Sequence, residues 1–147
     1  MKKIKLLIAL VSIIMAANGC GHSSPPIKPR PAHMPQPGQQ ITIDLRRAEE
    51  VKNLIREAGE VEDSSAVVVN QDIAAAIKVS GFNRLRLESI RNQARERIKQ
   101  AHPGFHVYLT SDKKLFAQLQ QLEQDIRESN LSPPEARAKA NKVISDM

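Results

Sequence analysis

Residues 65–79, SAVVVNQDIAAAIKV, are the stretch of this 147-residue chain that decides its fold. The first five residues are rich in β-branched valine, and residues 73–79 alternate Ile73, Ala75, Ile77 and Val79 with Ala74, Ala76 and Lys78. The polar turn Asn70-Gln71-Asp72 separates the two runs. Two short strand-like runs around a polar turn predict a β-hairpin.

Amphipathic patterns on both sides of this hairpin predict helices. Residues 45–58 place five apolar side chains on one face, with Asp44 as the N-cap and Gly59 as the stop. Residues 84–101 give the clearest pattern, and His102-Pro103-Gly104 ends it. The apolar stripe of this second helix consists of Leu87, Ile90, Ala94, Ile98 and Ala101.

The remaining elements follow in the last third of the chain. Residues 105–110 alternate apolar and polar side chains, which predicts a third strand. Ser111 or Asp112 then caps a helix whose stripe is Leu115, Leu119, Leu122 and Ile126. Ser132-Pro133-Pro134-Glu135 predicts the start of a last short helix, which ends at about residue 144. Its weak apolar face predicts loose docking.

The order α-β-β-α-β-α plus a tail helix predicts a small α+β domain. We expect a three-stranded sheet with helices packed on one face. A right-handed crossover makes the third strand parallel to the second, while the order of strands in the sheet stays open. The domain spans residues 41–128, enough for a small core, and residues 129–147 form the tail.

The first twenty residues predict an export signal. Three lysines lie among the first five residues, and residues 6–17 contain only one polar residue, Ser12. Twelve helical residues reach about 18 Å, short of the roughly 30 Å hydrocarbon core, which disfavours a permanent transmembrane anchor. We therefore expect a signal peptide over residues 1–19, with cleavage between Gly19 and Cys20.

Cys20 is the only cysteine, so the chain has no intramolecular disulfide. With Gly19 before it, Cys20 resembles the lipobox of bacterial lipoproteins, which implies that it carries diacylglycerol. The alternative is an ordinary secreted protein with a cysteine near the cleavage point. Several acyl chains would anchor the protein stably at a membrane.

A proline-rich stretch follows, and with Cys20 it makes up residues 20–40. Most of the nine prolines lie between Pro25 and Pro37, which prevents helix and sheet. An extended spacer would reach about 60 Å at about 3.1 Å per residue. Alternatively, Lys28 and Arg30 belong to a proline-rich ligand for an SH3-like groove.

The charge of the chain is unevenly distributed. Fourteen basic and fourteen acidic residues balance over residues 41–128, but residues 84–101 alone carry a net charge of +4. A row of cations lies beside the apolar stripe of this helix: Arg84, Arg91, Arg95 and Lys99. The row is a solvated helix edge, a docking face for an acidic partner or second copy, or a contact with anionic lipid. Nucleic acid is disfavoured because the chain is exported and lacks interleaved aromatic residues.

The sequence offers no catalytic or cofactor motif. His102 and His106 have a spacing that suits a metal on a helix, but Pro103 and Gly104 lie between them. Asp112 could supply a third ligand, yet nothing places it there. Structural histidines are the better interpretation, so we expect no metal, no cofactor and no enzyme activity.

Several features together resemble the YhcN/YlaJ family of sporulation lipoproteins. They are the lipoprotein signal, the spacer, the segment DLRRAEEVKNLIREAGEVEDSSAVVVNQDIAAAIKV (44–79), the arginine-rich helix and HPGFHVYLTSD (102–112). The chain departs from that family at Asn70-Gln71-Asp72, where glycine is often expected. The resemblance implies a membrane-held lipoprotein of endospore-forming bacteria, associated with spore formation, germination or outgrowth. The element order is also similar to BON and ring-building modules.

We therefore expect a lipid-anchored protein on the extracytoplasmic face of a membrane, in the spore envelope. Its function would be that of a non-catalytic interaction or assembly module with a protein partner. Two alternatives remain: an accessory protein that binds cell-wall cortex, and a module that assembles with copies of itself into a ring.

Overall fold

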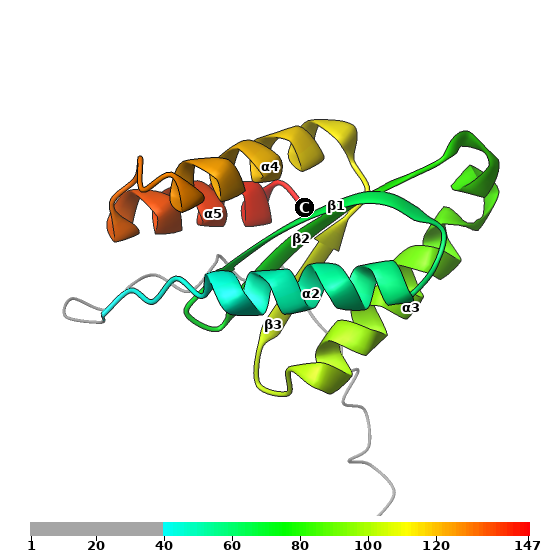
Figure 1. Ribbon diagram of the computed structural model, residues 1–147, viewed down its shortest axis with the longest axis horizontal. Helices are drawn as coiled ribbons and strands as arrows, with labels where there is room; N and C mark the ends of the chain where they lie inside the picture. Colours follow the sequence, from blue (N-terminus) through cyan, green and yellow to red (C-terminus); the bar gives the residue numbers. More distant parts are fainter. Residues whose placement is uncertain (1–39) are drawn as a thin grey trace, which may run out of the picture. The chain divides into compact units, whose positions relative to one another are not determined.

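The computed structural model describes residues 40–147, so the predicted signal peptide, Cys20 and all but the last residue of the spacer lie outside it. The described part consists of three strands, four α-helices and one 3₁₀ turn (Figure 1). Their bounds are α2 Leu45–Glu57, β1 Val61–Val69, β2 Asp72–Val79, η1 Gly81–Arg86, α3 Leu87–Ala101, β3 His106–Thr110, α4 Lys113–Arg127 and α5 Pro133–Ser145. The α+β class is confirmed, as are the hairpin and the order of elements.

The three strands form one mixed sheet in the order β1-β2-β3. β1 and β2 are antiparallel, and β3 runs parallel to β2, as the crossover predicts. Val69 pairs with Asp72 across the hairpin turn, and Asn70 adopts a left-handed conformation with φ 56°. Asparagine tolerates this conformation better than most residues, so the tight turn forms here without glycine.

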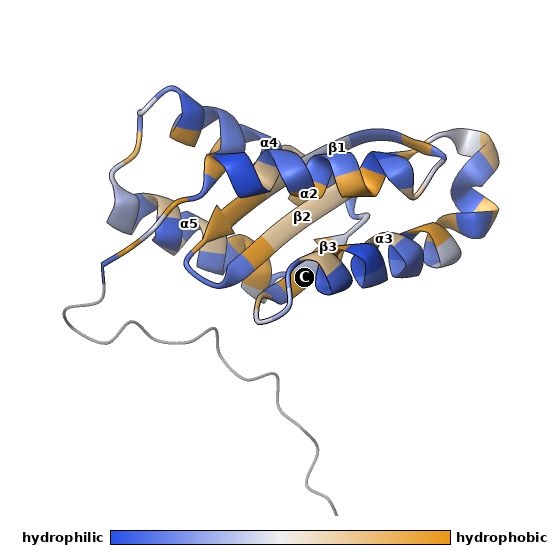
Figure 2. Ribbon diagram, turned by 60° about the horizontal axis from the view of Figure 1, so that its bottom comes forward, coloured by the Kyte–Doolittle hydropathy of each residue, from blue (hydrophilic) through white to orange (hydrophobic). Residues whose placement is uncertain are grey.

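The expectation that helices cover one face of the sheet is wrong, because helices cover both faces (Figure 1). On one side α2 and α3 pack against Ala66, Val68, Ile73, Ala75 and Ile77. On the other side α4 and α5 pack against Val67, Val69, Ala74 and Ala76. Since both central strand segments are apolar at every position, each face needs a cover. Figure 2 shows hydrophobic residues along the strands and on the sides of helices that face them.

The C-terminal helix is part of the core and does not dock loosely. Ser132 and Glu135 form the predicted capping box at its start. Ala136 and Ala140 are at most 2% exposed, and the helix shares one apolar cluster with α4 and the sheet. Because alanine side chains are small, α5 can lie close to α4. The apolar face of α5 is therefore buried, although its residues have low hydrophobicity.

The second predicted helix begins later than expected. Residues 84–86 belong to the 3₁₀ turn η1, and α3 starts at Leu87. Arg86, at the N-cap position, makes no side-chain capping bond. The stripe residues Ile90, Ala94 and Ile98 are buried, whereas Ala101 is exposed.

Candidate functional site

Two large apolar side chains project from the turn η1, which lies between β2 and α3 at one end of the sheet (Figure 1). Phe82 is 96% exposed and Leu85 is 99% exposed. Polar contacts hold the turn in place: Arg86 forms an ion pair with Glu60, and Asn83 donates to the Glu60 carbonyl. We call residues 81–86 the apolar tip, because this anchored turn carries two large apolar side chains that are almost fully exposed.

An open groove of about 570 Å³ lies next to the apolar tip, between the starts of α3 and α4. Its apolar lining comes from Ile77, Val79, Leu87 and Phe116. Arg84 and Lys113 line the groove as well, and neither forms an ion pair within residues 40–147. The groove therefore combines an apolar floor with unpaired positive charge.

The floor of this groove includes a free strand edge. β3 pairs with β2 only as far as Ala76 and Thr110. β1 continues beside β2 to Val79, but in the described part of the chain no strand pairs with residues 77–79 on the other side. An unpaired edge between apolar side chains can accept an added strand from another polypeptide.

The four cations predicted as an interaction face lie in different surroundings. Arg84 and Lys99 are exposed, and Lys99 forms an ion pair with Glu96. Arg91 and Arg95 are half-buried, and Nη2 of Arg95 donates to the carbonyl of Leu109 on the edge strand β3. Arg95 thus occupies a sheet edge, and Arg84 is the member of the row that reaches the groove. The role of the row as an interaction face stays a prediction.

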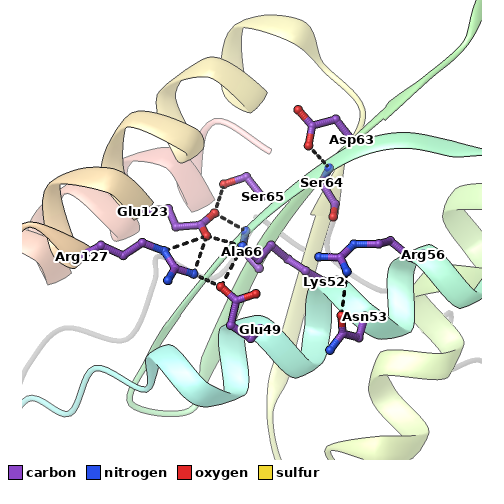
Figure 3. Close-up of polar contacts among 10 residues, drawn as sticks. All are labelled: Glu49, Lys52, Asn53, Arg56, Asp63, Ser64, Ser65, Ala66, Glu123 and Arg127. Carbon is purple, nitrogen blue, oxygen red and sulfur yellow. Dashed lines mark hydrogen bonds and ion pairs between the residues drawn. The ribbon is translucent and has the colours of Figure 1, made fainter.

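A cluster of charged side chains lies at the opposite edge of the sheet, along β1 (Figure 3). Glu123 on α4 is 7% exposed, and its carboxylate accepts hydrogen bonds from the Ser65 hydroxyl and the Ala66 amide of β1. Lys52 of α2 and Arg127 of α4 donate to the same carboxylate. Glu49 of α2 pairs with both cations and completes the cluster.

This cluster did not emerge from the sequence patterns, although a signal for it exists. Glu123 lies four residues after Leu119 and three before Ile126, within the buried face of α4. A charged residue at such a position must find partners, because burying an unpaired carboxylate is costly. With Lys52 and Arg127 as partners, Glu123 has a structural role: it joins the helices on the two faces around β1.

The two candidate metal-binding histidines lie in contrasting surroundings. His102 is 6% exposed, and its Nδ1 accepts a hydrogen bond from Arg47. Burial, followed by the charge of Arg47, lowers the pKa of His102. His106 is exposed on β3, and Asp112 caps α4 through the amides of Lys114 and Leu115. Within residues 40–147 no group of three or more histidine, cysteine or acidic side chains is arranged to hold a metal ion.

A membrane-crossing helix is likewise not found in the described range, where every helix is too short or too polar to span a bilayer.

Comparison with known proteins identifies one family. The family of sporulation lipoproteins YhcN/YlaJ has a model that matches residues 31–133, more than two thirds of the chain. The match covers the chain from the spacer through α4 to the start of α5. No curated protein and no solved structure matches the chain, so the likeness to BON and ring-building modules stays a prediction.

Proposed function

The chain belongs to the YhcN/YlaJ family of sporulation lipoproteins, and from this membership we propose that it is a lipid-anchored, non-catalytic interaction module of the spore envelope. Cys20 would carry the lipid, and the proline-rich spacer would hold residues 41–147 away from an extracytoplasmic membrane surface. We propose that the lipid is inserted in the spore membrane.

The observation that carries this proposal is the apolar tip beside the groove. Phe82 and Leu85 are exposed together, although burying each in an interface would gain about 1.5–3 kcal/mol. The tip borders the free edge of β2, where backbone groups can pair with an incoming strand. These features favour a polypeptide partner over a small substrate.

The charges around the groove indicate which charge the partner should carry. Arg84 and Lys113 have no ion-pair partner within residues 40–147, and Asp63 is the single carboxylate among the lining residues. The partner proposed is an extended segment with apolar residues for the groove and carboxylates for the two cations. Complementary charge of this kind increases the association rate and the specificity.

The experiment places a photo-crosslinking amino acid at position 85 of the full chain in sporulating cells. We expect one discrete adduct, and Lys113→Glu should reduce its yield strongly. Lys114→Glu is the matched control, because the neighbouring lysine does not line the groove and should leave the yield unchanged. No adduct, or equal yields from both variants, would contradict the proposal.

Self-assembly is the second candidate, because the free edge of β2 can accept a strand from another copy as well. The mass of the adduct separates the two candidates, since a second copy gives twice the mass of the chain. Pull-down of the chain on purified sacculi tests the alternative of cortex binding. Hydrolysis of cortex peptidoglycan by the purified chain, abolished by a point mutation, would overturn the non-catalytic assignment.

A further inference from the structure

A second cavity lies at the other end of the β1–β2 hairpin, away from the apolar tip. It has a volume of about 600 Å³ and is lined mainly by polar residues. The hairpin turn Asn70-Gln71-Asp72 forms one wall, Phe105 and His106 form another, and the first described residue, Gln40, lies at the cavity as well. Arg47 reaches it from α2 and Arg137 from α5, so both helix layers contribute a guanidinium group.

Arg137 is the unusual member of this cavity. It is only 7% exposed, and its Nη1 is buried without a hydrogen-bond partner in the described residues. No ion pair of Arg137 occurs within residues 40–147 either. Leaving a buried charged donor unpaired opposes folding, and an acceptor bound in the cavity would remove that cost.

The other charged groups of the cavity limit what that ligand can be. The side chain of Asp44 pairs with Arg47 and accepts from the Arg47 amide, and Arg47 also donates to His102. Asp72 lines the same cavity, so the two arginines and two aspartates carry no net charge. This balance disfavours a polyanion and suits a ligand with one anionic group and further polar groups.

We propose that Arg137 anchors a binding site for the single carboxylate or phosphate group of a small polar molecule. The fork of donors on a guanidinium matches both oxyanions and can bind either one through two parallel hydrogen bonds. Phe105 supplies an apolar wall, and its ring already lies 4.5 Å from the guanidinium carbon of Arg47. This site is independent of the apolar tip and of the partner proposed for it.

The test measures thermal unfolding of the full chain in nonionic detergent. Sodium phosphate and sodium acetate are the two probes, with sodium chloride at matched ionic strength as the reference. A ligand that binds only the folded state should raise the midpoint by about 5 °C or more once its concentration exceeds Kd tenfold. A rise with phosphate alone identifies a phosphate site, a rise with acetate alone a carboxylate site, and a rise with both a general oxyanion site.

Two variants assign the effect to Arg137. Arg137→Met keeps the apolar stem, should abolish the rise, and should unfold at a higher temperature than wild type without ligand. Arg97→Met is the control, because Arg97 lies on the exposed side of α3 outside the cavity and should keep the full rise. No rise in wild type with either probe, or a rise that persists in Arg137→Met, would overturn the proposal.

A direct measurement covers the case in which Arg137→Met does not fold. In full chain labelled with ¹⁵N-arginine, the side-chain signal of Arg137 should move as phosphate or acetate is added. Arg137→Lys assigns that signal by its disappearance. Unchanged arginine signals up to the highest probe concentration would also overturn the proposal.

Discussion

Lys52 and Glu123 lie on helices that cover opposite faces of the sheet, yet Nζ of Lys52 is 2.5 Å from Oε1 of Glu123. They meet around the outer edge of β1, where the other oxygen of Glu123 accepts from the backbone of Ala66. Arg95 likewise covers part of the outer edge of β3, through the carbonyl of Leu109. Charged side chains at strand edges prevent uncontrolled pairing with other chains, and the open end of β2 has no such contact in the described residues.

Removing the carboxylate of Glu123 should destabilise the domain strongly. Glu123→Ala leaves the buried Ser65 hydroxyl and the Ala66 amide without an acceptor and leaves Lys52 and Arg127 with Glu49 alone. We expect a loss of about 3–5 kcal/mol in the free energy of unfolding. Urea unfolding of the full chain in detergent measures it. Glu128→Ala, an exposed position at the end of the same helix, should change the free energy by less than about 0.5 kcal/mol. Equal losses in both variants would contradict a structural role for the cluster.

His102 should make the stability depend on pH. Burial and Arg47 lower its pKa in the folded state, while Glu50 and Asp44 act in the opposite direction. Between this lowered pKa and the usual value of about 6.5 the unfolded chain binds more protons, so stability rises with pH through the window. The stability is lost as the pH falls from above 6.5 through the folded-state pKa.

The variant His102→Asn tests this dependence, because asparagine can accept from Arg47 but does not titrate. Its free energy of unfolding, measured between pH 7.5 and 5, should fall less than that of wild type. His106→Asn changes the exposed histidine and should keep the wild-type slope. A slope that is the same in all three proteins would show that His102 does not titrate in this window.

The apolar tip should contribute to binding and not to folding. Replacing both exposed side chains, in the variant Phe82→Ser/Leu85→Ser, removes no buried contact, and we expect the free energy of unfolding to stay within about 0.5 kcal/mol of wild type. With the crosslinker moved to position 120, which lines the groove outside the tip, the adduct with the partner should be lost. A large fall in stability would mean that the two side chains pack within the domain in solution.

Helix α5 should be required for a stable fold. Ala140→Asp places a carboxylate at a position that is 2% exposed, and we expect a loss of about 3 kcal/mol or more. Ala138→Asp changes an exposed residue of the same helix and controls for helix propensity. If thermal unfolding of both variants gives the same midpoint, α5 is peripheral and the predicted boundary after residue 128 is preferable.

The lipid anchor depends on Cys20. Cys20→Ala should abolish incorporation of labelled fatty acid and release the chain from membranes, because no other cysteine can be acylated. Fractionation of sporulating cells with a labelled lipid precursor measures both effects. Full membrane association of the variant would instead indicate that the apolar leader remains as an anchor.

Most of the secondary structure could be predicted from local patterns. Helix α2 begins at the predicted cap Asp44, α4 begins at Asp112, one of the two predicted alternatives, and Ser132 starts α5 with its capping box. These signals are local, because a cap bonds to amides two or three residues away. The sequence pattern places the start of α3 three residues too early, because Arg84 fits the helical spacing but lies in the 3₁₀ turn.

The candidate sites were much harder to predict. Leu85 lies within the predicted helix 84–101 but off its apolar stripe. The pattern alone did not indicate that Leu85 would be fully exposed on a turn beside Phe82. Arg137 shares the buried face of α5 with Ala140 and Ile144. The helical spacing predicts this placement, but it does not indicate what the buried guanidinium group would contact. Neither pattern reveals which distant residues lie beside these side chains.

The sequence by itself determined the elements of this protein, the parallel arrangement of β2 and β3, and the family to which the chain belongs. These properties depend on hydrogen bonds between near neighbours, on crossover handedness and on a pattern spread along the chain. Only the tertiary structure decided that helices cover both faces, that Lys52 meets Glu123 around β1, and that residues 77–79 keep a free edge. Each of these features depends on packing between segments that are far apart in the sequence. The free energy gained by burying both apolar faces of the sheet outweighs the secondary-structure preferences of the individual segments.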